Sequence, residues 1–263
     1  MVELRAFAKF HRPALERDEV RHNLILGFLH RLGELPELRV WTLGAPGECA
    51  VQTTPRRALI LGELTATACA AFADMTAGLD YAGVVGVDDI APAFVTHARE
   101  RGVAFAGPVP QLIQALRERP TYSGNTGSAR FVEPADFALF AGWMVAFLKE
   151  AAPHDPLPSR EDLERTIADK RFQFWIVEGE PVAMAGIVRR TSHTAAIAGV
   201  YTPPPLRGRG HAAAVTAAVV DSVFAEGRTA ACLYSDLRNP ASNRCYAKIG
   251  FKPVCRAWHY LRI

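Results

Sequence analysis

The stretch VYTPPPLRGRGHAAA, residues 200–214, is the most informative segment of this 263-residue chain. It leads from an apolar strand pattern into Gly208 and Gly210, and then into an alanine-rich helical pattern over residues 211–227. Glycines let a ligand approach the backbone closely, and the first N–H groups of a helix lack intrahelical partners. Arg207 and Arg209 can add charge-assisted hydrogen bonds. The stretch therefore predicts a phosphate-binding strand–loop–helix unit.

The glycine spacing fits two different motifs. Residues 208–213 match the G-x-G-x-x-A variant of the dinucleotide fingerprint, and Asp236 ends the next strand pattern, where a ribose-binding acid could lie. Against this fit, residues 203–207 separate the strand from the glycines, and only residues 237–263 remain for further βαβ units. The segment upstream also has an antiparallel hairpin pattern. We therefore favour the second motif, R-x-x-G-x-A over residues 207–212.

This second motif resembles motif A of the GCN5-related N-acetyltransferases (GNAT), whose loop holds the pyrophosphate of acetyl-coenzyme A. One strand later, the spacing N-x-x-x-N-x-x-Y-x-x-x-G-F over residues 239–251 is similar to motif B of that family. The resemblance covers about residues 130–263, including the order of helices and strands. It implies an α/β fold of the α+β type, with a mixed, mostly antiparallel sheet flanked by helices.

The resemblance also implies an activity, the transfer of an acetyl group from acetyl-CoA to a primary amine by direct attack in a ternary complex, with no metal. The backbone N–H of Val200 would polarise the thioester carbonyl. Tyr246 would protonate the leaving thiolate. The residues expected to bind the cosubstrate are Val200, Tyr201, Arg207, Gly208, Arg209, Gly210, His211, Ala212, Asn239 and Asn243.

The general base and the acceptor stay open at this stage. The candidate bases Glu133, Asp136, Glu178 and His193 have no diagnostic neighbours, and some family members use ordered water instead. The acceptor, a small molecule or a peptide, would be shaped by residues 133–190. Without an evident base, a non-catalytic coenzyme A-binding regulatory module is the alternative function. The oligomeric state is also left open.

The polar segment RPTYSGNTGSA, residues 119–129, has the composition of a linker. It separates a domain over residues 130–263 from a second α/β domain of similar size over residues 1–118. In this N-terminal half we expect a helix over residues 12–32, a strand over 103–107 and a helix over 110–118.

The N-terminal half also has a counterpart of the motif A position. The apolar strand AGVVGV, residues 82–87, leads into Asp88 and Asp89, where R-x-x-G-x-A would otherwise stand. Two carboxylates at a helix start would repel a pyrophosphate. The N-terminal half thus resembles a degenerate GNAT-like domain, and we expect that it does not bind coenzyme A there.

Composition excludes several other classes of protein. The net charge of +3 is too small to indicate nucleic-acid binding. The five cysteines are widely spaced without a C-x-x-C pair, which favours free thiols in a reducing cytoplasm over a zinc site. The apolar run over residues 137–148 is too short to cross a bilayer, so no membrane partner is expected. The N-terminus lacks the apolar core of a secretory signal, and we expect a cytoplasmic protein.

Overall fold

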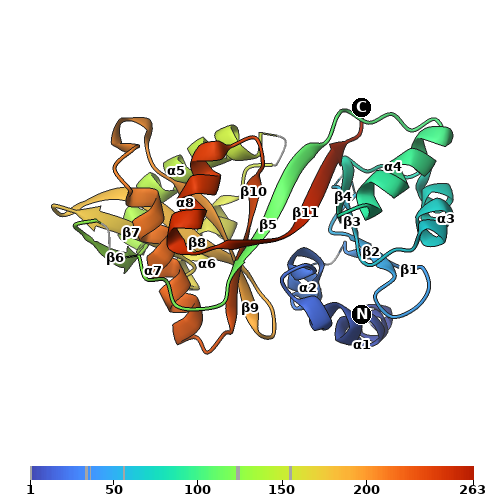
Figure 1. Ribbon diagram of the computed structural model, residues 1–263, viewed down its shortest axis with the longest axis horizontal. Coiled ribbons are helices and arrows are strands. Elements are labelled where there is room, and N and C mark those ends of the chain that lie inside the picture. The colour runs from blue at the N-terminus through green and yellow to red at the C-terminus, as the bar shows by residue number, and fades with distance from the viewer. Residues whose placement is uncertain (1, 33–34, 36, 56, 123–124, 154–155) are drawn as a thin grey trace. The chain divides into compact units, whose positions relative to one another are not determined.

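The computed structural model describes residues 2–32, 35, 37–55, 57–122, 125–153 and 156–263. The chain forms two compact units (Figure 1). Unit 1 comprises residues 1–114, 234–240 and 253–263, and unit 2 comprises residues 115–233 and 241–252. Each unit combines a sheet with helices, so the expected α/β class with a second domain of similar size is confirmed.

Unit 2 is built on an antiparallel meander followed by one parallel crossover. Strands β6 to β9 pair antiparallel in chain order, and β9 pairs parallel with β10 after the helix α7. The elements are β6 (Ser128–Phe131), the 3-10 helix η3 (Pro134–Asp136), α5 (Phe137–Ala151), α6 (Arg160–Ala168), β7 (Phe172–Val177), β8 (Glu180–Arg190), β9 (Thr194–Tyr201), the 3-10 helix η4 (Pro204–Leu206), α7 (His211–Ala225), β10 (Ala230–Asp236) and α8 (Pro240–Ile249).

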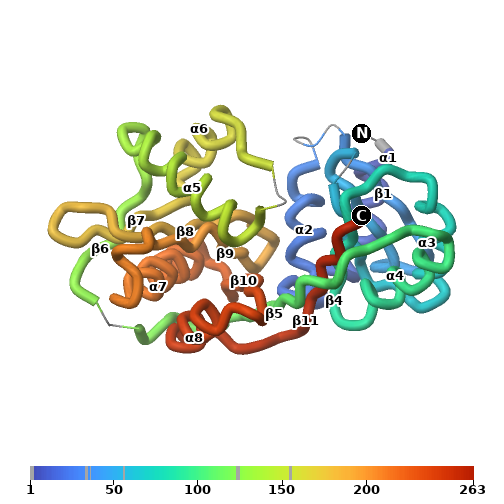
Figure 2. Tube along the Cα trace, turned by 90° about the horizontal axis from the view of Figure 1, so that it is seen from above, coloured from blue at the N-terminus to red at the C-terminus, as the bar shows by residue number. Residues whose placement is uncertain are grey.

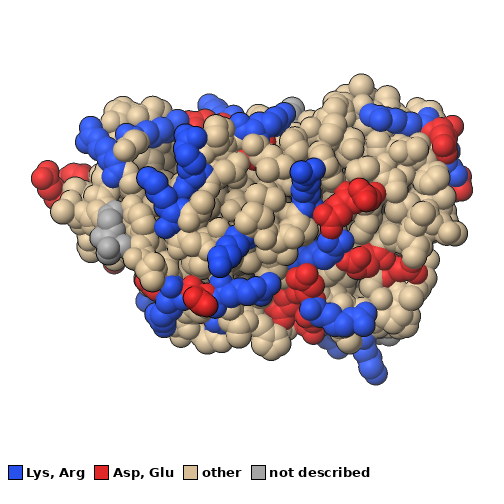
Figure 3. Space-filling view, viewed as in Figure 1, with Lys and Arg blue, Asp and Glu red and all other residues tan. Residues whose placement is uncertain are grey.

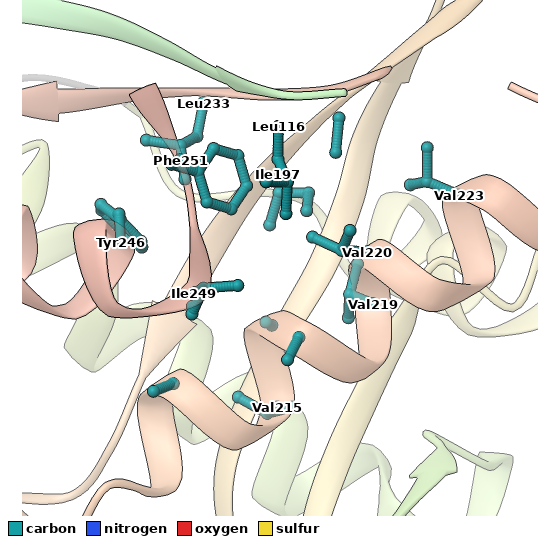
Figure 4. Packing of buried hydrophobic residues seen from close by; sticks show 14 of the residues in the cluster. Leu116, Ile197, Val215, Val219, Val220, Val223, Leu233, Tyr246, Ile249 and Phe251 are labelled. Atoms are coloured by element: carbon teal, nitrogen blue, oxygen red, sulfur yellow. The ribbon is translucent and has the colours of Figure 1, made fainter. Parts of the chain in front are cut away.

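Helices cover both faces of the unit 2 sheet. Figure 2 shows α5 and α6 on one side of the strands β7 to β9 and α7 on the other. On the α7 side, valines four residues apart (Val215, Val219 and Val223) pack with Ile197 of β9 and Leu233 of β10 (Figure 4). Burial of such a side chain contributes about 1.5–3 kcal/mol, so this spacing fixes which face of α7 meets the sheet.

On the opposite face of the sheet, α5 and α6 pack over a second hydrophobic core. Phe140 of α5 is fully buried, and its ring lies 5.1 Å from that of Phe172 in β7. Leu163 of α6 belongs to the same cluster. The Ser159 hydroxyl, which accepts from the Asp162 N–H at 3.1 Å, caps the N-terminus of α6, as the S-x-x-D spacing predicts.

Unit 1 has the same kind of sheet. Strands β1 to β3 pair antiparallel, β3 and β4 pair parallel, and β11 from the chain's end pairs antiparallel with β4. The elements are α1 (Val2–Leu15), the 3-10 helix η1 (Glu16–Asp18), α2 (Asn23–Leu29), β1 (Arg39–Thr42), β2 (Cys49–Gln52), β3 (Leu59–Leu61), α3 (Ala66–Thr76), β4 (Gly83–Val87), α4 (Ile90–Glu100), β5 (Val109–Leu116) and β11 (Lys252–Leu261).

The two halves of the chain repeat one order of helices and strands. The order α1-α2-β1-β2-β3-α3-β4-α4-β5 recurs as α5-α6-β7-β8-β9-α7-β10-α8-β11. In each half, the helix between two parallel paired strands follows the third strand of the meander. The junction of β9 and α7 in unit 2 thus corresponds to the junction of β3 and α3 in unit 1, and the end of β10 to the end of β4.

Three local expectations were wrong. Residues 110–118 form the strand β5 instead of a helix, and residues 103–107 make only one bridge, between Phe105 and Arg262. The helix expected over residues 12–32 is divided into α1, η1 and α2. For β5, burial is continuous over residues 113–116, as in a strand covered on both faces, so tertiary pairing overrides the local helix signal.

The compact units also differ from the division expected at residues 119–129. Residues 253–263 cluster with unit 1, because β11 pairs with β4 along Ala257–Leu261. Part of the expected linker is structured as well, since β6 begins at Ser128; residues 123–124 of that segment lie outside the described residues. A polar composition marks the crossing between halves but cannot reveal where the last strand pairs.

Candidate functional site

The end of β9 has an irregular backbone. Gly199 adopts a φ of +65°, and a Cβ there would lie 2.4 Å from the Phe172 ring, so only glycine fits. The register between β9 and β10 ends at Ile197 and Leu233. On the other edge, pairing with β8 continues to Tyr201, opposite Met184. The last four residues of β9 therefore leave the edge toward β10 open to a ligand.

The loop after β9 carries two left-handed glycines. Gly208 has a φ of +79° and Gly210 a φ of +83°, which places Gly210 as the N-cap of α7. A Cβ at Gly208 would meet nothing within 4 Å, so the space around it is open. These conformations are easy for glycine and strained for other residues. They turn the chain from the loop into the helix within three residues.

The first turn of α7 offers unpaired N–H groups. The Ala214 N–H donates to the Gly210 carbonyl at 3.0 Å, so the N–H groups of residues 211–213 precede the intrahelical hydrogen bonds. Arg209, in the loop next to them, is exposed, and Arg244 and Lys248 of α8 are also exposed. Figure 3 shows Lys and Arg gathered on this face of unit 2. The helix dipole and these cations together favour an anionic ligand.

The Arg207 guanidinium is bound by partners within the protein. Its Nε donates to the Thr202 carbonyl at 2.8 Å, and its Nη2 contacts both carboxylate oxygens of Glu150 at 2.8 Å. Its guanidinium also lies 5.7 Å from the centre of the Tyr201 ring. Arg207 thus joins the loop to α5, and Arg209 is the motif arginine left exposed without a carboxylate partner among the described residues.

A buried hydroxyl next to the loop has no partner. Thr202 is 8% exposed, and its Oγ1 makes no hydrogen bond to the described part of the chain. Buried polar atoms are nearly always paired, and an orphaned one costs free energy. The open backbone of β9, the Thr202 hydroxyl and the N–H groups of α7 together fit a long ligand that carries amides and a pyrophosphate.

Tyr246 of α8 lies in the core cluster that also contacts Val200 (Figure 4). Its side chain is 8% exposed and its ring lies 6.0 Å from that of Phe251, edge to face. Burial raises the pKa of the phenol, with a smaller contribution from Cys245. A tyrosine phenol is protonated at neutral pH even without this shift, as a proton donor must be. Asn239 and Asn243 lie before and within the first turn of α8.

The four candidate bases have different surroundings. Asp136 is paired with Arg130 at 2.6 and 2.9 Å, which lowers the pKa of the carboxyl, and its Oδ2 also accepts from the Glu133 N–H. Glu178 occupies a left-handed position in the turn between β7 and β8, with a φ of +52°. His193 precedes β9, and eight residues, about 26 Å of extended strand, separate it from Tyr201.

The corresponding junction in unit 1, between β3 and α3, holds an ion pair. The Glu63 carboxylate lies there, accepts from the Arg21 Nε at 2.6 Å and lies 2.8 Å from the His22 Nε2. Asp88, which the sequence placed at the motif A position, instead follows β4, the counterpart of β10, and its carboxylate also binds the Arg21 guanidinium. An anion is thus built into the place where unit 2 presents its glycine loop. The Arg21 pairing is not visible in the sequence, because its partners lie 42 and 67 residues away.

Sequence reasoning missed four residues around the loop, namely Tyr122, Asn125, Glu150 and Thr202. Tyr122, Asn125 and Glu150 contact the loop only through the fold, and Thr202 lies in the loop but is distinguished only by its unpaired buried hydroxyl. The described residues include no group of three His, Cys, Asp or Glu side chains that could hold a metal ion. Nor does the described part of the chain contain a helix with the length and apolarity to span a bilayer.

Comparison with known proteins gives a family match for part of the chain. Residues 138–251 match the model of the acetyltransferase (GNAT) family. No curated protein matches the chain in sequence. Among solved structures, a GCN5-related N-acetyltransferase from Kribbella flavida is 20% identical with a TM-score of 0.59, and covers 90% of this chain and 95% of its own.

Two further structures show the same fold over nearly the whole chain. A Drosophila protein has a TM-score of 0.67 at 14% identity, covering 98% of this chain and 94% of its own. A tandem GNAT protein from the clavulanic acid biosynthesis pathway has a TM-score of 0.56 at 13% identity, covering 90% and 87%. The match to a tandem protein agrees with the repeated order of elements in the two halves.

Proposed function

Because residues 138–251 form an acetyltransferase domain of the GNAT family, we propose that the chain transfers an acetyl group from acetyl-CoA to a primary amine by direct attack in a ternary complex. The observation that carries the proposal is the loop with two left-handed glycines between β9 and α7. It presents unpaired N–H groups and Arg209 to an anion, beside an open stretch of β9. Bound acetyl-CoA supplies the thioester and thereby the activated acetyl group.

Each part of the site has a separate role in this proposal. The N–H groups of residues 208–213 bind the pyrophosphate, and Arg209 neutralises part of its charge. The backbone of Gly199–Tyr201 pairs with the pantetheine amides, and the Val200 N–H stabilises the oxyanion. Asn239 and Asn243 hydrogen-bond the pantetheine arm. Arg207 orients the loop through its pairs with Glu150 and the Thr202 carbonyl.

Tyr246 is the proposed proton donor to the leaving thiolate. Like any tyrosine phenol, it is protonated at neutral pH and can donate a proton. Tyr246 belongs to the hydrophobic cluster that Val200 also contacts, so the proposed proton donor and the proposed oxyanion-binding N–H both belong to unit 2. A positioned general acid contributes about 10²–10⁴-fold to a rate. The acceptor amine itself is deprotonated through ordered water in this proposal, since Asp136 is paired with Arg130 and His193 lies at the opposite end of β9 from Tyr201.

The direct test measures two quantities on the same protein. Calorimetry should detect acetyl-CoA binding, and a free-thiol assay should detect coenzyme A release when small amines and peptides are supplied. Trp143 and Phe147 of α5 pack beside the cluster that contains Tyr201, so amines with an apolar moiety belong in the panel. Absence of binding would refute the proposal.

The alternative is a non-catalytic module that binds coenzyme A for regulation. It is favoured by one observation, that the candidate base Asp136 is held in an ion pair with Arg130. Tight binding without thiol release across the whole amine panel would establish this alternative. Thiol release that depends on an amine would exclude it.

A further inference from the structure

Tyr122 and Asn125, the described residues closest before β6 that we call the crossing segment, contact the glycine loop at three points. The Asn125 Nδ2 donates to the Arg209 carbonyl at 2.9 Å and lies 2.7 Å from the His211 Nδ1. The Tyr122 hydroxyl lies 3.5 Å from the Gly210 carbonyl. The Asn125 side chain thus contacts the loop on both sides of Gly210.

These contacts fix the orientation of the Asn125 amide and the tautomer of His211. The Arg209 carbonyl can only accept, so the atom facing it must be the Asn125 nitrogen. The same NH₂ group then donates its second hydrogen to the His211 Nδ1, which must be an unprotonated acceptor. The ring is therefore neutral and carries its hydrogen on Nε2.

Burial supports the same assignment for His211. The residue is only 6% exposed, and burial lowers the pKa of its imidazole, with a smaller contribution from the Arg209 cation. Arg209 and Tyr122 are the charged and titratable side chains that the loop and the crossing segment bring near the ring. A neutral imidazole at the first position of α7 is thus the resting state at neutral pH.

We infer that Asn125 is a positioning residue for the phosphate loop, which it holds by bridging the Arg209 carbonyl to the His211 ring. With both carbonyls of residues 209 and 210 turned toward the crossing segment, the N–H groups of the loop and of α7 are turned toward the ligand. Asn125 does not itself touch the ligand in this inference. Because Asn125 already orders the loop, the loop loses less conformational entropy when an anion binds. The inference rests on the proposed function for its ligand.

The test compares Asn125→Ala with Thr126→Ala, a control at the exposed neighbouring residue. Calorimetry with coenzyme A should show an affinity about fivefold lower for Asn125→Ala, the effect of losing the net contribution of one or two neutral hydrogen bonds. Thr126→Ala should bind like the unaltered protein. Thermal unfolding of both variants checks that the fold is intact.

A second readout needs no ligand. The His211 ring is titrated by NMR in the unaltered protein and in Asn125→Ala. Because Asn125 donates to the neutral ring and so favours it, the pKa of His211 should rise in the variant. In Asn125→Asp, which has the same shape but places a carboxylate beside the ring, it should rise further. Asn125→Asp keeps the side-chain volume, so a loss of packing cannot explain the change.

The outcomes separate this inference from the proposed function. An unaltered affinity in Asn125→Ala, or an unaltered His211 pKa, would overturn the positioning role. Protonation of Nδ1 in the unaltered protein would overturn it as well. If the unaltered protein binds no coenzyme A, the proposed function fails, while the ligand-free titration still decides whether Asn125 holds the ring.

Discussion

The sharpest perturbation of the phosphate loop is Gly208→Ala. Gly208 has a φ of +79°, which costs a residue with a Cβ about 1–2 kcal/mol. A Cβ there would meet nothing within 4 Å, so the substitution adds backbone strain without a steric clash. The loop can relieve that strain only by rotating its peptide groups. Binding would then have to restore the strained form, so acetyl-CoA affinity should fall by roughly 5- to 30-fold.

Gly227→Ala is the matched control for this prediction. Gly227 follows the far end of α7, has a φ of +78° and also has open space around its Cβ position. The backbone strain in the two variants is therefore the same, and their free energies of unfolding should fall by similar amounts. Calorimetry and chemical denaturation measure the two effects separately. Equal affinities in the two variants would refute the argument that the loop binds the pyrophosphate.

Other variants test the remaining parts of the site and of unit 1. Tyr246→Phe should lower kcat by about 10²-fold or more with little change in acetyl-CoA affinity, and an unchanged kcat across several pH values would remove Tyr246 as the acid. Arg209→Ala should weaken coenzyme A binding more at low than at high salt, because an exposed cation is screened, whereas a salt-independent loss would contradict a phosphate contact. Glu150→Gln should raise the KM for acetyl-CoA a few-fold and leave kcat unchanged, since Glu150 acts through Arg207; a lower kcat at saturation would point to a direct role. Hydrogen bonds from His22 and Arg21 lower the pKa of Glu63 to about 2. The ionised carboxylate therefore stabilises the fold fully above pH 4.5, and this stabilisation is lost as the pH falls toward 2. For a carboxylate that is 44% exposed we expect this contribution to be on the order of 1 kcal/mol after allowing for solvent screening, and Glu63→Gln should remove the corresponding part of acid unfolding.

The phosphate loop was predictable because its signal is local. The glycines at residues 208 and 210, the strand before them and the helix after them lie within one stretch, and the structure has β9, a loop with two left-handed glycines and α7 there. Strand and helix alternation likewise predicted the meander of unit 2. In such segments the residue pattern and the final contacts involve the same neighbours.

The features that could not be predicted from the sequence depend on contacts between residues that lie far apart in the chain. Residues 110–118 have a helical pattern, but their pairing and two-sided burial make β5 a strand. Residues 253–263 belong to unit 1 because β11 pairs with β4, which lies some 170 residues earlier in the chain. Asn125 and Glu150 reach the loop from 84 and 57 residues away. No periodicity or spacing rule encodes such contacts, because each depends on how two elements meet in space.

The most direct measurement is the stoichiometry of acetyl-CoA binding to the full chain by calorimetry. Unit 2 offers the glycine loop, and unit 1 holds the carboxylate of Glu63, paired with Arg21, at its corresponding junction between β3 and α3. We therefore predict one molecule bound per chain, with an affinity that Gly208→Ala lowers. No binding, or two molecules per chain, would contradict the assignment of a single donor site to unit 2.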